Sequence, residues 1–305
     1  MSCEKILPTR RAVLAGLGAL AVPLPAGAAI GPHLRPIPAT GERVPAIGMG
    51  TWITFNVGDD AGLRAARTEV LQAFFDLGGQ VVDSSPMYGS AQAVIGHALA
   101  RVSAPERLFS ATKVWTPLAM LGDGQMADAR DLWGIPRFDL MQVHNLLNWD
   151  GHLPTILAEK AAGRVRYVGV TTSHGRRHDE LEQVMARQPL DAVQLTYNVV
   201  DRQAEARLLP LAAERGLMVV INRPFKRGAL FDSYARHPLP SWAAEIGCAN
   251  WAQVFLKFII SHPAVTVAIP ATSRVDHMAE NMGALHGPLP DQALRVRMAR
   301  DIAAL

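Results

Sequence analysis

Residues 81–89 read Val-Val-Asp-Ser-Ser-Pro-Met-Tyr-Gly, a short run of β-branched residues that leads into a carboxylate and then a phenol. Residues 108–114 read Leu-Phe-Ser-Ala-Thr-Lys-Val and residues 138–144 read Phe-Asp-Leu-Met-Gln-Val-His, so each of these runs also carries an ionisable side chain at or near its end. β-Branched residues pack well on a buried pleated surface. The three stretches therefore predict buried strands with chemically active groups at their C-terminal ends.

The same pattern recurs along the chain. The predicted strands are residues 46–52, 81–84, 108–114, 138–144, 165–171, 192–198, 218–223 and 266–270. Segments with helical spacing of apolar residues separate them, at 61–77, 90–101, 153–162, 178–187, 205–214, 250–261 and 274–285. Eight strands alternating with helices over about 250 residues predict an α/β fold, a (β/α)8 TIM barrel with its active site at the C-terminal strand ends. A doubly wound sheet is the alternative, but no candidate strand is followed by the glycine fingerprint of that fold.

Both ends of the barrel sequence carry additional elements. A proline-rich lead and the turn Thr40-Gly41-Glu42 predict an N-terminal β-hairpin. Residues 290–304 predict a C-terminal helix, whereas the helical pattern in 115–137 is the weakest because Gly122-Asp123-Gly124 interrupts it. No break in composition divides residues 29–305, which we expect to form one barrel domain.

Composition excludes several classes of protein. The 305 residues are 49% hydrophobic and 19% charged, which is typical of a globular chain rather than a disordered one. The formal net charge of +3 and the absence of long basic runs argue against nucleic acid as a partner. Scattered histidines without an HExxH motif predict no metal site. The sequence does not specify an oligomer, so we expect a monomer.

The first 29 residues, MSCEKILPTRRAVLAGLGALAVPLPAGAA, have the features of a targeting segment. Arg10 and Arg11 precede an apolar run that ends in Ala26-Gly27-Ala28, a small–x–small cleavage site. This resembles a twin-arginine signal. We expect residues 1–28 to be a signal peptide that engages the twin-arginine translocation machinery and is cleaved after Ala28, with a periplasmic product. An uncleaved anchor is the alternative, although a stable span needs about 20 strongly apolar residues.

Four side chains at the predicted strand ends suit the reduction of a carbonyl group. That reaction needs a hydride for the carbon and a proton for the oxygen. Tyr88 can supply the proton, and a nearby ammonium, Lys113, would lower its ordinary pKa of about 10. Asp83 can hold the ammonium in place, and His144, as a neutral imidazole, can orient the carbonyl oxygen.

The motifs resemble those of the aldo-keto reductase family. The matching segments are Asp-Ser-Ser-Pro-Met-Tyr-Gly (83–89), Ala-Thr-Lys-Val-Trp (111–115), Asp-Leu-Met-Gln-Val-His (139–144), Val-Gly-Val-Thr-Thr (168–172), Gln-Leu-Thr-Tyr-Asn (194–198) and Ile-Pro-Ala-Thr-Ser-Arg (269–274). The resemblance implies reduction of an aldehyde or ketone by NAD(P)H, with NADP(H) expected over NAD(H). It also implies that the cofactor binds without a Rossmann domain.

The resemblance also implies which residues hold the cofactor. The nicotinamide carboxamide would meet Thr171, Thr172 and Gln194, and the adenosine end with its phosphate would meet Thr272, Ser273, Arg274, Glu280 and Asn281. Gly50, Thr51 and Trp52 would border cofactor and substrate. Two departures stand out. Asn222 and Arg223 occupy the strand end where many members place an aromatic residue, and Ala271 replaces a phosphate-binding lysine.

The substrate pocket and two other hypotheses complete the prediction. Trp52, Trp115 and Trp149 each follow a predicted strand, so they could wall an apolar substrate pocket. A cofactor-binding redox sensor or auxiliary subunit with little turnover is the main alternative function. A cofactor-free lyase or isomerase on the same barrel is the other.

Overall fold

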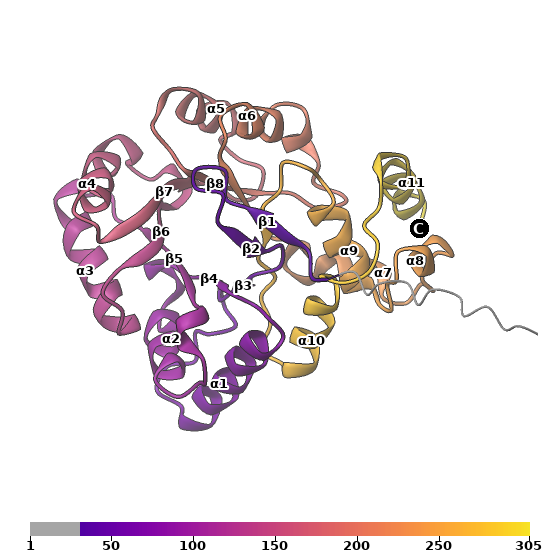
Figure 1. Cartoon of the computed structure of the whole chain (residues 1–305), viewed down its shortest axis with the longest axis horizontal. Helices are drawn as coiled ribbons and strands as arrows, with labels where there is room; N and C mark the ends of the chain where they lie inside the picture. Colours follow the sequence, from indigo (N-terminus) through magenta and orange to yellow (C-terminus); the bar gives the residue numbers. More distant parts are fainter. Residues whose placement is uncertain (1–30) are drawn as a thin grey trace, which may run out of the picture.

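Eight parallel strands form a ring in which each strand pairs with the next one along the chain (Figure 1). The strands are β3 (Met49–Gly50), β4 (Val81–Asp83), β5 (Phe109–Val114), β6 (Phe138–Val143), β7 (Val165–Thr171), β8 (Ala192–Thr196), β9 (Met218–Asn222) and β10 (Val267–Ala268). Parallel bridges from Ile47 to Ala268 and from Gly50 to Ala271 join the two edges of the sheet. The predicted (β/α)8 barrel is confirmed, and each predicted strand is present.

The structure is a computed structural model that describes residues 31–305. The predicted signal peptide, residues 1–28, lies outside these described residues. Within residues 31–305, no helix combines the length and the apolar character needed to cross a bilayer.

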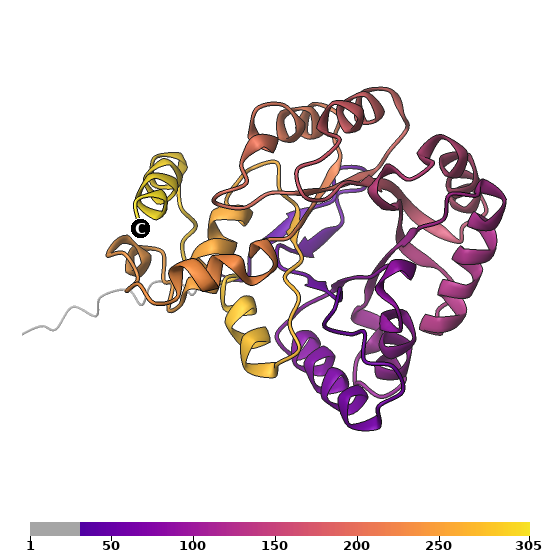
Figure 2. The same ribbon diagram turned by 180° about the vertical axis from the view of Figure 1, so that it is seen from behind.

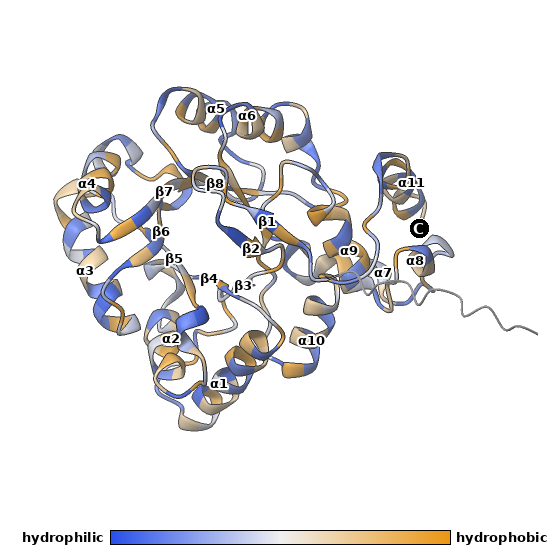
Figure 3. Cartoon of the chain, viewed as in Figure 1, coloured by the Kyte–Doolittle hydropathy of each residue, from blue (hydrophilic) through white to orange (hydrophobic). Residues whose placement is uncertain are grey.

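Helices surround the ring (Figures 1 and 2). They are α1 (Ala61–Asp76), α2 (Ala91–Leu99), α3 (Gly122–Trp133), α4 (Trp149–Ala161), α5 (His178–Arg187), α6 (Leu208–Glu214), α7 (Ala229–Tyr234), α8 (Trp242–Glu245), α9 (Trp251–Ile260), α10 (Val275–Gly283) and α11 (Gln292–Ala303). Figure 3 shows that these helices carry both hydrophobic and hydrophilic residues, as amphipathic helices packed on a barrel should. The predicted C-terminal helix is α11, which lies outside the ring next to α8. There the Trp242 indole donates a hydrogen bond of 3.0 Å to Asp301 Oδ2.

The predicted hairpin lies across the N-terminal end of the barrel. Its strands, β1 (Leu34–Pro36) and β2 (Arg43–Pro45), are antiparallel. Thr40 Oγ1 lies 2.8 Å from the Tyr167 hydroxyl at the start of β7, and Glu42 forms an ion pair with Arg166. These contacts attach the hairpin to the strand ends and close that end of the barrel.

Alternation along the strands divides the interior of the barrel into an apolar and a polar layer. Successive side chains in a strand point to opposite faces, so residues two apart share a face. In β5, Phe109 belongs to the apolar cluster of the interior, and Lys113 lies on the same face four residues later. In β6, Leu140 belongs to that cluster and Gln142 follows it. The apolar layer therefore fills the hairpin end, and polar groups occupy the C-terminal end.

Two helical regions differ from the expectation. Helix α3 begins at Gly122 itself, so the glycines that weakened the pattern in 115–137 lie in its first turn. The short helices α7 and α8 were not predicted. They have six and four residues, too few for a periodic pattern to show in the sequence.

Close packing of α2 on α3 makes a prediction about stability. A Cβ atom at Gly96 in α2 would lie 1.8 Å from the carbonyl oxygen of Leu132, whereas one at Gly124 in α3 would meet nothing within 4 Å. We expect Gly96→Ala to lower the free energy of unfolding by about 1–3 kcal/mol, because the backbone of α2 or α3 must move to make room for the methyl group. The matched variant Gly124→Ala should raise it by about 0.5–1 kcal/mol. Urea unfolding of both variants measures the difference, and equal stabilities would contradict the packing.

Candidate active site

The carboxylate of Asp83 lies at the centre of the polar layer and receives donors from three other strands. Lys113 Nζ lies 2.6 Å from its Oδ2 and also donates to the Ser84 carbonyl at 2.8 Å. Gln194 and Gln142 donate to Oδ1 at 2.9 and 3.4 Å. Both charges of the pair are buried, and burial lowers the pKa of Lys113 while its contact with Asp83 opposes that shift.

Tyr88 and His144 lie beside this ion pair. Tyr88 ends a short 3-10 turn, Pro86–Tyr88, directly after β4. Its ring centroid is 5.3 Å from Lys113 Nζ and 5.7 Å from the His144 ring, which it meets at an interplanar angle of 87°. The structure therefore brings together all four side chains predicted as the catalytic group.

The pKa of Tyr88 differs from the expectation. The sequence suggested that Lys113 would lower it, but burial raises the pKa of Tyr88, and the negative charge of Asp83 raises it further. The physical reason is that burial disfavours the charged phenolate, and the neighbouring Asp83 carboxylate adds to this effect. Tyr88 consequently keeps its proton throughout the neutral range.

His144 is held as a neutral ring. Burial, assisted by the positive charge of Lys113, lowers the pKa of His144 to about 3. Its Nδ1 lies 2.8 Å from Ser85 Oγ. One ring nitrogen therefore carries a proton and the other does not.

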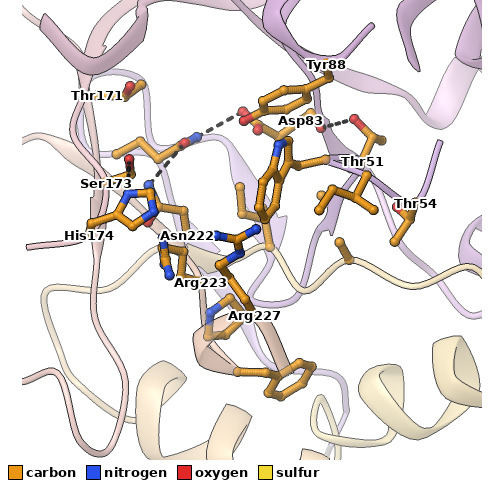
Figure 4. Close-up of a pocket in the computed structure, with 18 of the residues that line it drawn as sticks. Thr51, Thr54, Asp83, Tyr88, Thr171, Ser173, His174, Asn222, Arg223 and Arg227 are labelled. Carbon is orange, nitrogen blue, oxygen red and sulfur yellow. Dashed lines mark hydrogen bonds between the residues drawn. The ribbon is translucent and has the colours of Figure 1, made fainter. Parts of the chain in front are cut away.

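A cavity of about 510 Å³ opens at this end of the barrel. Figure 4 shows Asp83 and Tyr88 on one wall and Arg223 and Arg227 on the other. Its predicted lining residues are Gly50, Thr51, Trp52, Asp83, Tyr88, His144, Thr171, Gln194, Asn222 and Arg223. Lys113 lies beneath the floor, where its side chain is fully buried.

Polar groups suited to an amide lie along one side of the cavity. Thr171 Oγ1 accepts from the Asn145 backbone at 2.9 Å, and its own proton has no partner within residues 31–305. Thr172 does not line the cavity; its hydroxyl is buried and has no partner within residues 31–305. Asn222 donates to the Thr172 carbonyl at 2.8 Å and approaches Gln194 Oε1 at 3.4 Å. The hydroxyl protons of Thr171 and Thr172 and the Gln194 amide oxygen could therefore bond a carboxamide, which offers both an acceptor and donors.

The residues predicted for the adenosine end do not line the cavity, although they follow one of its lining residues in the chain. Thr272, Ser273 and Arg274 follow Ala271, which lines the cavity, and they lead into α10. Thr272 Oγ1 accepts from the Arg274 backbone at 3.1 Å. Glu280 and Asn281 lie on α10 itself. These five residues are close in the chain and separate from the four catalytic candidates.

The three candidate tryptophans take different positions. Trp52 lines the cavity, as predicted. Trp115 is 41% exposed and lies outside it, because the Gln125 side chain bonds both its backbone N–H and its carbonyl. Trp149 also lies outside, at the start of α4, where its indole donates to Glu180 at 3.1 Å. The walls predicted from Trp115 and Trp149 are thus absent from this cavity.

Other lining residues carried no clear signal in the sequence. The Arg227 guanidinium lies over the Trp52 ring, 4.3 Å from its centroid, and Phe225 and Phe231 line the cavity nearby. Pro224 and Gly228 mark a turn after β9, which could have indicated a loop at the rim. Nothing in the sequence shows that Arg227 adopts a positive φ of 62° there.

The match to known proteins covers most of the chain. The profile of the Aldo/keto reductase family matches residues 46–296. The chain belongs to this family. It is therefore an oxidoreductase that reduces carbonyl groups with a nicotinamide cofactor, and the resemblance drawn from its motifs is confirmed.

The individual relatives share less than a third of their aligned residues with this chain. The chain is 29% identical over 262 residues to the methylglyoxal reductase YeaE of Escherichia coli, covering 82% of this chain and 89% of that protein. It is 27% identical to the aldo-keto reductase str7 of Strobilurus tenacellus, covering 72% and 76%. An aldo/keto reductase from Klebsiella pneumoniae in complex with NADP and acetate superposes with a TM-score of 0.73 at 23% identity, covering 86% and 93%. That last likeness supports the fold.

Proposed function

We propose that Tyr88 is the proton donor in the reduction of an aldehyde or ketone, with His144 orienting the carbonyl oxygen. The observation that carries this proposal is the edge-on contact of a protonated phenol with a neutral imidazole, with ring centroids 5.7 Å apart, on the wall of the cavity. Lys113 and Asp83 support the pair from beneath. Thr171, Thr172, Gln194 and Asn222 would hold the nicotinamide carboxamide, and Gly50, Thr51 and Arg223 would border the cofactor.

The acid works without a lowered pKa. When bound, the reduced nicotinamide supplies a hydride to the carbonyl carbon. Negative charge then develops on the oxygen, and Tyr88 transfers its proton there because an alkoxide is a stronger base than a phenolate. The neutral His144 can donate a hydrogen bond to the same oxygen, and the Lys113 ammonium, 5.3 Å from the phenol ring, stabilises the phenolate that remains.

A small reactive aldehyde is the substrate class we propose. Two relatives are named as methylglyoxal reductases, at 29% and 25% identity. Methylglyoxal is therefore the first substrate to assay, and the apolar residues Trp52, Met87 and Phe231 on the cavity wall leave room for larger aldehydes in the same screen.

Removing the phenol hydroxyl tests the role of Tyr88. We expect Tyr88→Phe to lower kcat with methylglyoxal by about 10²–10⁴-fold, because the general acid is lost. The dissociation constant for NADPH, measured by quenching of tryptophan fluorescence, should stay close to that of the wild type. Tyr234→Phe is the matched control, because Tyr234 packs against Trp251 outside the cavity. Near wild-type turnover in Tyr88→Phe would exclude the assignment.

For the cofactor, we propose a moderate preference for NADP(H), with Arg274 as the ligand of the 2′-phosphate. Support comes from the similar structures that hold NADP. The preference should be moderate for two reasons. Ala271 offers no charge, and Arg274 Nε already donates to Asp276 Oδ1 at 2.9 Å. Because that carboxylate also repels a phosphate, Asp276 should weaken the binding of NADPH relative to NADH.

Opposite substitutions test this preference. Arg274→Ala should weaken NADPH binding by about tenfold, since a charge-assisted contact is lost. Asp276→Asn should strengthen it by about two- to fivefold, because the competing exposed pair is weak. Neither change should alter NADH binding. Fluorescence titration with both dinucleotides measures the ratio, and parallel changes for NADH and NADPH would contradict a role in recognising the phosphate.

We also propose that the protein is exported folded through the twin-arginine pathway and cleaved after Ala28, so that residues 29–305 form the periplasmic enzyme. Support comes from Arg10-Arg11 and the small residues at Ala26 and Ala28.

Conservative changes of the arginine pair test export. Arg10→Lys with Arg11→Lys should abolish periplasmic accumulation of the full-length protein, because the pathway reads both arginines. Arg176→Lys with Arg177→Lys alters the other arginine pair and should leave export unchanged. Cell fractionation measures both, and N-terminal sequencing of the product should begin at Ala29. Wild-type export of the first variant would contradict the proposal.

A further inference from the structure

The hydroxyl of Ser85 lies between two specific partners. Ser85 Oγ is 2.8 Å from His144 Nδ1 and accepts a hydrogen bond of 3.2 Å from the Met87 backbone N–H. Ser85 is fully buried, and His144 is 5% exposed. Ser85 adopts an extended backbone, with φ −163° and ψ 149°, at the start of the turn that carries Tyr88. One hydroxyl therefore touches both the imidazole and the turn that positions the phenol.

The partners of Ser85 decide the direction of its bond to His144. A serine hydroxyl has one proton to donate and two lone pairs. Met87 uses a lone pair, and Nδ1 of His144 is the sole acceptor for the proton within residues 31–305. If Nδ1 carried the ring proton instead, the Ser85 proton would be left buried without a partner, which is unfavourable. Ser85 is thus the donor and Nδ1 the acceptor.

The direction of this bond determines the tautomer of His144. The neutral ring has one proton, and Nδ1 accepts, so the proton lies on Nε2. Nε2 has no hydrogen-bond partner within the described part of the chain, and the ring borders the cavity. We infer that Ser85 is a positioning residue that holds His144 in the tautomer that donates from Nε2 to the substrate oxygen. This inference rests on the role proposed above for His144.

The other tautomer would be unproductive. With the proton on Nδ1, the Nε2 lone pair would face the carbonyl oxygen, and two acceptors repel each other. The repulsion would grow as negative charge develops on the oxygen, so the loss should appear in kcat more than in substrate binding. If Ser85 served only to cap the turn at Met87, its loss would not be expected to lower kcat while leaving substrate binding unchanged.

Kinetics of three variants test the inference. Ser85→Ala should lower kcat about tenfold, the value of one hydrogen bond to a buried group, and leave KM and the NADPH dissociation constant nearly unchanged. Ser85→Thr keeps the hydroxyl and suits the extended backbone, so it should restore most of kcat. Ser110→Ala is the control: it removes another buried hydroxyl of the barrel, one that bonds Asp139, and should leave kcat unchanged.

Nitrogen-15 NMR of the full-length protein gives a readout that a structural role would not change. The His144 signals are assigned by their loss in His144→Gln. In the wild type we expect the proton on Nε2 and a bare, hydrogen-bonded Nδ1, and in Ser85→Ala a mixture of both tautomers. The inference is wrong if the wild type carries the proton on Nδ1, if Ser85→Ala keeps full kcat, or if kcat falls without a change of tautomer. Should the wild type reduce no carbonyl compound, the proposed function fails, and the NMR spectrum still decides the tautomer.

Discussion

The ion pair of Lys113 and Asp83, buried at the centre of the barrel, is the constraint on which the site depends. Two charges removed from water are tolerated only with short contacts and further hydrogen bonds, and removing one partner of such a pair typically costs about 3–5 kcal/mol. Here the carboxylate receives donors from β5, β6 and β8, so it ties four strands together at one level. The strands that carry the catalytic candidates cannot shift relative to one another without breaking this arrangement.

The pair also determines the electrostatics of its neighbours. Tyr88 is buried beside the Asp83 carboxylate, and both the burial and the negative charge raise its pKa. His144, buried beside the same ammonium, is kept neutral. The site therefore combines a protonated phenol with an uncharged imidazole. That combination suits the delivery of a proton to an oxygen that becomes basic during the reaction.

The barrel and the four side chains of its catalytic group could be predicted from the sequence, because runs of β-branched residues alternate with helical patterns and end in polar groups within recognisable motifs. In β5, Phe109 and Lys113 are four residues apart, so they lie on the same face of the strand. The direction of the Tyr88 pKa shift could not be predicted, because it depends mainly on how deeply the folded chain buries the phenol. The position of Trp115 depends on a hydrogen bond to Gln125 in α3, that of Trp149 on one to Glu180 in α5, and that of Arg227 on a backbone with positive φ. The pattern of residues within a strand contains no information about such contacts with distant residues.

The hairpin at the N-terminal end of the barrel limits where ligands can enter the cavity. Glu42, bonded to Arg166 and to the Tyr167 hydroxyl, helps seal the floor of the barrel beneath an apolar layer. Within residues 31–305, the hairpin and the apolar layer lie at the N-terminal end of the barrel, and the cavity lies at the C-terminal ends of the strands. The cofactor and the carbonyl substrate would therefore both enter and leave at the C-terminal ends of the strands.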